Sequence, residues 1–85
     1  MYRKRKETTV MKLKEPIAVR EKLMQRRGWN TIDEIAANLG MSTNTISRAL
    51  RGEPVRIVTV TALARAIEST ANDIAELAGK STNQH

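Results

Sequence analysis

Residues 31–52, TIDEIAANLGMSTNTISRALRG, constrain the fold of this chain more than any other segment. They predict two short helices joined at Gly40, because a left-handed glycine is a usual helix end. Ala36 is small enough to let the helices cross closely, and Ile46 follows at the spacing that a helix-turn-helix requires. The apolar interior of this motif is expected to come from Ile35, Leu39, Ile46 and Leu50.

The helix starts have local causes in the sequence. Thr31 and Glu34 form the pattern Thr-x-x-Glu, which is a capping box for the first helix. Ser42 is a favourable N-cap for the second helix. Both helices are therefore expected to begin at a side chain that satisfies their first free N–H groups.

The second helix has two contrasting faces. Each helical residue advances by about 100°, so Asn44, Arg48 and Arg51 lie roughly 140–160° from Ile46. Ser47 lies between the two faces. The outward row thus carries amide, hydroxyl and guanidinium groups and contains no carboxylate.

These outward groups match the edges of DNA bases. Arginine can donate two hydrogen bonds to O6 and N7 of guanine, and asparagine can bond N6 and N7 of adenine. The alternative is an ordinary solvated helix face. Because the same segment also has the glycine turn and the caps, we favour a helix that reads DNA.

The segment resembles the Cro and phage-repressor helix-turn-helix family, often called the Xre family. The resemblance covers roughly residues 17–78 and includes the expected fourth and fifth helices. It implies an all-α, five-helix, lambda-repressor-like DNA-binding domain that acts as a small transcriptional repressor. The matching residues are Ile35-Ala36, Leu39-Gly40-Met41-Ser42, Thr45-Ile46-Ser47-Arg48, Arg51-Gly52-Glu53, Thr59-Val60, Leu63-Ala64 and Ala66-Ile67.

The resemblance also assigns contacts. Base reading falls to Asn44, Ser47 and Arg48, with Thr43 added on family grounds. The family's glutamine, which helps to fix the first helix of the motif on a phosphate, is replaced here by Thr31-Ile32 in a loop one residue longer. We therefore expect backbone contacts from Asn30, Thr31, Arg51 and Arg56, where Arg56 precedes the fourth helix; its alternative is a simple surface arginine.

Positive charge is concentrated at the N-terminus. The chain has a net charge of +6, yet residues 1–28 contribute +7 and residues 29–85 contribute −1. A basic total suits a polyanionic partner, and this distribution predicts a basic arm over residues 1–14 that is flexible without DNA. Residues 8–13 could add a short extended segment. The arm residues expected on phosphates or in the minor groove are Arg3, Lys4, Arg5 and Lys6; the alternative is a solvated terminus.

The remaining pattern completes the organisation. Pro16 suits a first helical turn, and helices are expected over residues 17–27, 57–69 and 70–77, with Ile74 and Leu77 on the buried side of the last. Trp29 is expected in the core. The DNA-binding domain is assigned to residues 15–79, and residues 80–85 form a polar tail.

Several other classes of function are disfavoured. The chain lacks cysteine, a phosphate-binding glycine loop, a metal-ligand cluster and a nucleophile–base set, so no enzyme, metal or cofactor is expected. It shows no membrane-length apolar run, secretory signal or evident site for a small-molecule effector, which favours the cytoplasm. The expected partner is double-stranded DNA, bound as a homodimer on a near-palindromic operator.

One alternative remains open within the same family. An antitoxin would also bind a toxin partner while it represses its own gene. An exposed apolar surface or a foldable tail would favour that reading, and residues 80–85 look too short and polar for it. A purely structural interaction module fits the basic N-terminus poorly.

Overall fold

The structure, a computed structural model, describes residues 7–82, and within them it contains five helices and three strands. The helices are α1 (Pro16–Arg27), α2 (Ile32–Leu39), α3 (Thr43–Leu50), α4 (Ile57–Ala66) and α5 (Ala71–Ile74). The strands are β1 (Glu7–Leu13), β2 (Val55–Arg56) and β3 (Ala75–Thr82). The five predicted helices are confirmed, and the prediction of an all-α fold is corrected by the strands.

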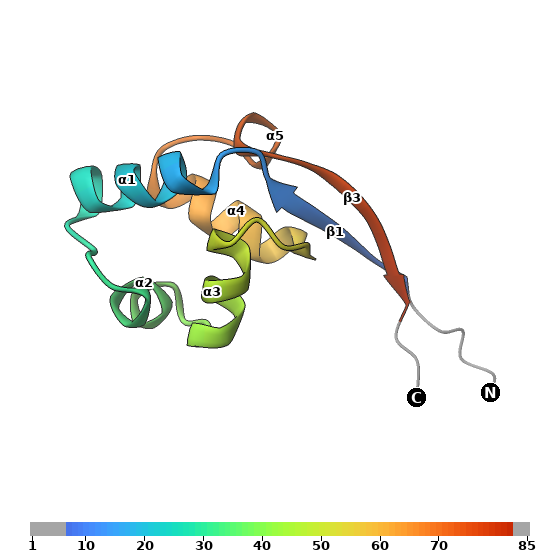
Figure 1. Ribbon diagram of the computed structural model, residues 1–85, viewed down its shortest axis with the longest axis horizontal. Coiled ribbons are helices and arrows are strands. Elements are labelled where there is room, and N and C mark those ends of the chain that lie inside the picture. The colour runs from blue at the N-terminus through green and yellow to red at the C-terminus, as the bar shows by residue number, and fades with distance from the viewer. Residues whose placement is uncertain (1–6, 83–85) are drawn as a thin grey trace.

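The strands form one antiparallel sheet in the order β2-β1-β3. β1 pairs with β3 from Glu7↔Thr82 to Leu13↔Ala75, and with the two residues of β2 through Val10 and Met11. The register between β1 and β3 shifts at Val10/Met11, which is a bulge in the ladder. β1 and β3 make a ribbon that extends away from the helices (Figure 1).

The ribbon changes the description of both chain ends. Residues 7–13 lie within the arm predicted to be flexible but form β1, in agreement with the extended segment suggested for residues 8–13, and Met11 and Leu13 are buried in the core. The last helix was predicted to reach residue 77 but ends at Ile74, and Leu77 is 70% exposed on β3. Pairing with β1 gives the backbone of residues 75–82 hydrogen-bond partners that a longer helix would otherwise supply.

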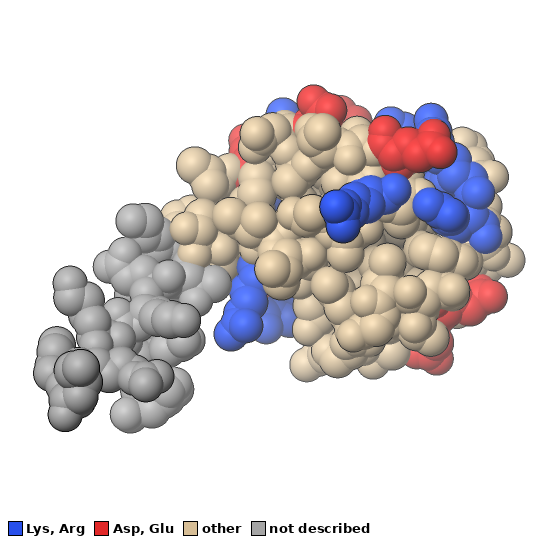
Figure 2. Space-filling view, turned by 180° about the vertical axis from the view of Figure 1, so that it is seen from behind, with Lys and Arg blue, Asp and Glu red and all other residues tan. Residues whose placement is uncertain are grey.

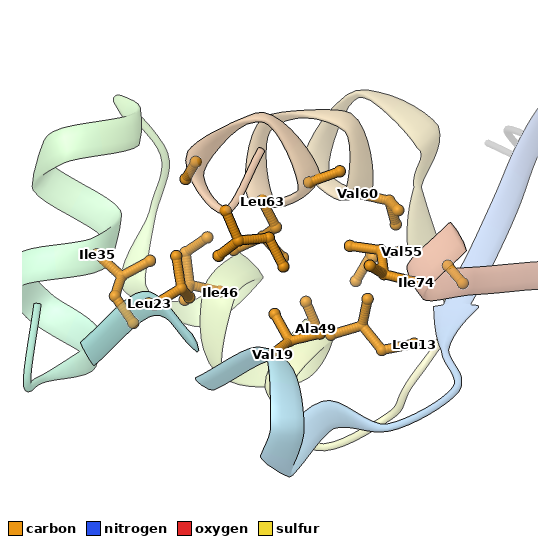
Figure 3. Packing of buried hydrophobic residues seen from close by; sticks show 14 of the residues in the cluster. Leu13, Val19, Leu23, Ile35, Ile46, Ala49, Val55, Val60, Leu63 and Ile74 are labelled. Atoms are coloured by element: carbon orange, nitrogen blue, oxygen red, sulfur yellow. The ribbon is translucent and has the colours of Figure 1, made fainter. Parts of the chain in front are cut away.

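The core lies where α1, α3 and α4 meet, with α2 closing one end (Figure 3). Fully buried side chains come from four helices: Leu23, Ile35, Ile46, Val60 and Leu63. The predicted interior of the helix-turn-helix is confirmed for Ile35 and Ile46, and Leu39 and Leu50 are half-buried against the same cluster. Trp29 is also half-buried there.

Candidate nucleic-acid interface

The turn between α2 and α3 is fixed at both sides by backbone hydrogen bonds. At its end, α2 has Gly40 in the left-handed region, with φ of 68°. The N–H of Gly40 donates to the carbonyl of Ala37 at 3.3 Å, and the N–H of Met41 donates to that of Ala36 at 2.9 Å. This is the Schellman pattern of helix termination, so Gly40 sets the direction in which α3 departs.

Capping side chains set where the two helices begin. The Thr31 hydroxyl accepts from the Glu34 N–H at 3.1 Å, and the Glu34 carboxylate accepts from the Thr31 N–H at 3.2 Å. Ser42 Oγ accepts from the Thr45 N–H at 3.1 Å at the start of α3. The predicted capping box and the predicted N-cap are both present.

α3 is divided into a buried and an exposed face, as its residue pattern predicts. Ile46 and Ala49 are 0% exposed, whereas Thr43, Asn44 and Arg48 lie in solvent and Ser47 is half-buried. The predicted rotation of the helix is therefore confirmed. The exposed face presents hydroxyl, amide and guanidinium groups together on one short helix.

Glu53 changes the electrostatics of this face, and the sequence analysis missed it. Arg48 Nε lies 3.4 Å from one carboxylate oxygen of Glu53, and Arg51 Nε lies 3.2 Å from the other. The outward row of α3 contains no acidic residue, but the turn after the helix places the Glu53 carboxylate beside both of its arginines. The available signal was the Gly52-Glu53 pair directly after the helix, because glycine lets the chain fold back there.

A groove of about 630 Å³ adjoins α3 and separates it from the start of α4. Arg48 and Arg56 both line this groove, so the structure brings these two predicted DNA contacts to one depression. Arg56 is the N-cap of α4 and makes no side-chain capping hydrogen bond. The first N–H groups of α4 thus receive no hydrogen bond from that side chain. Free N–H groups at the start of a helix favour the binding of an anionic group.

Asn30 and Thr31 lie at a different place, the start of α2. Both are exposed, but the Thr31 hydroxyl already takes part in the capping box. The N–H of Asn30 donates to Glu34 at 2.9 Å. Among the described residues, no hydrogen bond or ion pair joins them to the outward row of α3. Arg3, Lys4, Arg5 and Lys6 lie outside the described residues.

Part of the basic N-terminal charge belongs to α1 and has structural contacts. Arg26 pairs with Glu68 at 3.0 Å. Arg27 donates to the carbonyl of Ala66 at 2.8 Å and its guanidinium lies 5.8 Å from the centre of the Trp29 ring. Figure 2 shows Lys and Arg side chains grouped over α1 with acidic side chains beside them. These arginines tie α1 to the end of α4.

The part of the chain that the structure describes, residues 7–82, offers neither a metal-ion site nor a membrane-spanning helix. It contains no group of three or more His, Cys, Asp or Glu side chains placed to hold a metal ion. None of its helices combines the length and the apolar character that crossing a membrane requires.

Comparison with known families matches residues 21–80 to the Cro/C1-type HTH DNA-binding domain. This match runs from the middle of α1 into β3, so it includes the whole helix-turn-helix and every residue that lines the groove except Val10. No match was found among curated proteins or among solved structures. The chain belongs to the Cro/C1-type helix-turn-helix family of DNA-binding domains, whose function is DNA binding in transcription regulation.

Proposed function

We propose that this chain is a sequence-specific repressor that reads double-stranded DNA with α3 in the major groove. The observation that carries the proposal is the division of α3 into two faces. Ile46 fixes the helix in the core, and Asn44 and Arg48 project from the exposed face. A major groove about 12 Å wide accepts a helix presented in this way.

The side chains of α3 suggest separate roles. Arg48 is assigned to the O6 and N7 atoms of a guanine, and Asn44 to an adenine, because these pairs form two hydrogen bonds each. Thr43 and Ser47 can donate to or accept from neighbouring base edges. The phosphate contacts that position α3 are assigned to Asn30, Thr31, Arg51 and Arg56, with Arg3, Lys4, Arg5 and Lys6 from the N-terminal residues.

Two copies are proposed to bind one near-palindromic operator. Helix-turn-helix dimers place their reading helices about 34–36 Å apart, which is one turn of DNA. A protein bound across such a site represses transcription by blocking access to the promoter. The chain is proposed to act as a weak homodimer or as a monomer that pairs on the DNA.

The test is selection of bound duplexes from a randomised DNA pool, followed by sedimentation of the complex and a promoter–reporter assay. The expected result is one enriched motif that is an inverted repeat, bound by two copies, with lower reporter expression. A pool without any enriched motif would overturn sequence-specific reading. A non-repeated motif bound by one copy would overturn the dimer, and raised expression would overturn repression.

An antitoxin is the second candidate. Its supporting observation is Leu77, which is 70% exposed on a strand that the sequence analysis did not predict, so part of the C-terminal segment does fold. Purification from source cells in the presence and absence of DNA tests this alternative. A stoichiometric protein partner that is lost in Leu77→Asp would support it, and recovery of the chain without such a partner would oppose it.

A further inference from the structure

The turn after α3 brings an acidic side chain back to the exposed face of the helix. Gly52 has φ of 82°, and its N–H donates to the carbonyl of Ala49 at 3.1 Å. The N–H of Glu53 donates to the carbonyl of Arg48, also at 3.1 Å. In this Schellman arrangement the side chain two residues beyond the C-cap Arg51 lies beside the side chain of the residue whose carbonyl its N–H binds. That contact is usually apolar, and here it joins Glu53 to Arg48.

The Glu53 carboxylate is shared by two arginines. One oxygen faces Arg48 Nε at 3.4 Å and the other faces Arg51 Nε at 3.2 Å. The three side chains are 44–61% exposed. Ion pairs in solvent contribute little to folding stability. The main consequence of this cluster is therefore its effect on charge and side-chain orientation at the DNA-facing surface.

We propose that Glu53 is a specificity-determining residue that positions Arg48 and lowers the affinity of this face for DNA of arbitrary sequence. This inference rests on the proposed function, because it assumes that Arg48 reads a base. Glu53 acts through the two arginines and needs no contact of its own with DNA.

The effect on orientation follows from the atoms used. Glu53 engages Arg48 through Nε, the atom nearest the stem of the side chain. The two terminal nitrogens point away from Nε and remain available as a pair of donors. A guanine offers O6 and N7 as two acceptors side by side. Arg48 can therefore keep its pair with Glu53 while it donates to guanine.

The effect on non-specific binding follows from charge. Affinity for arbitrary DNA comes mainly from phosphate neutralisation by Lys and Arg. Glu53 offsets one of the two positive charges on Arg48 and Arg51, and its own charge repels nearby phosphates. This cost falls on every DNA sequence, whereas the benefit of an oriented Arg48 appears only where the correct base is present. The charge therefore lowers affinity for all DNA, and the orientation of Arg48 recovers affinity only at the correct base, so the two together raise the ratio of specific to non-specific affinity.

The test uses the full chain carrying Glu53→Gln, which removes the charge and keeps the size. Dissociation constants are measured over a series of salt concentrations for the selected duplex and for a scrambled duplex. Glu68→Gln is the matched control, since Glu68 also pairs with an arginine, at 3.0 Å, but beyond the C-terminal end of α4. Both variants lose one exposed carboxylate, so a general charge effect is common to them.

We expect Glu53→Gln to bind the scrambled duplex about fivefold more tightly at about 0.15 M salt, the equivalent of one added phosphate contact. The slope of log K against log salt should steepen by up to about 0.9. Affinity for the selected duplex should rise less, so the specificity ratio should fall. In an Arg48→Ala background, Glu53→Gln should leave the ratio of specific to non-specific affinity nearly unchanged, because Glu53 then has no Arg48 side chain to position.

Two results would overturn the inference alone: equal tightening on both duplexes, or a response to Glu53→Gln that matches Glu68→Gln. A loss of thermal stability confined to Glu53→Gln would assign Glu53 to the fold and would also overturn it. A wild-type chain that binds both duplexes equally would instead overturn the proposed function, and the inference with it.

Discussion

Ile46 is the residue on which the orientation of α3 depends, and the stability lost on its replacement can be calculated from its burial. The side chain is 0% exposed and belongs to the central core cluster. Ile46→Ala removes three buried carbon atoms, and each buried CH₂ contributes about 0.8 kcal/mol. The cavity that remains adds to this loss. We therefore expect the free energy of unfolding to decrease by about 2.5–4 kcal/mol.

Thermal denaturation followed by circular dichroism measures this loss. For a domain of this size, 1 kcal/mol corresponds to about 4–8 °C, so the melting temperature should fall by roughly 10–30 °C. Ile17→Ala is the matched control, because Ile17 is 76% exposed on α1 and its truncation should cost less than about 0.5 kcal/mol. Equal melting temperatures for the two variants would refute the burial of Ile46. The assignment of Asn44 and Arg48 to the opposite face would then fail as well.

Three other predictions test the parts of the fold around this helix. Leu13→Ala should lower the free energy of unfolding by about 2–4 kcal/mol, because Leu13 is buried in the core; an unchanged melting temperature would mean that β1 is not part of the folded unit. Gly40→Ala should lower the free energy of unfolding by about 1 kcal/mol, because alanine is strained at the left-handed φ of 68°. The added Cβ would meet no atom within 4 Å, so a steric clash adds nothing to this loss. Chemical denaturation measures the loss, and a gain in stability would contradict a left-handed residue at this position. Deletion of residues 1–6, which hold four Lys or Arg, should reduce the steepness of the salt dependence of DNA binding by roughly two to four units; an unchanged slope would make this segment a solvated terminus.

The helix-turn-helix could be predicted from the sequence because its determinants are local. Thr31 with Glu34, Gly40 and Ser42 act within a few residues of the helix ends that they define. The rotation of α3 follows from the 3.6-residue period of its apolar side chains. The same reasoning places Asn44 and Arg48 outward without knowledge of any distant segment.

The ribbon could not be predicted in the same way, because its hydrogen bonds join the two ends of the chain. Met11 and Leu13 alternate with Lys12 and Lys14, which is a strand pattern, but a pattern of four residues does not identify its partner. The spacing of Ile74, Leu77 and Ala78 matches a helix equally well. Pairing with β1 decides in favour of a strand, and only the tertiary structure reveals that pairing.

Glu53 shows a similar limit within the site itself. A helix projection of α3 includes only residues of the helix, and it therefore gives a row without a carboxylate. The Schellman turn at Gly52 adds Glu53 to that row from outside the helix. The sequence pattern predicts the donors on the exposed face of α3, and the turn geometry places an acid beside Arg48 and Arg51.

The most direct test of the account is the base preference of Arg48→Ala on single-base variants of the selected duplex. We expect a loss of about 1–3 kcal/mol of binding free energy on the selected duplex and relaxed preference at one position, a guanine. Arg65→Ala, which removes the same charge from the last turn of α4, should leave the preference intact. An equal loss of affinity on every duplex would make Arg48 a phosphate contact and would contradict the claim that α3 reads sequence through it.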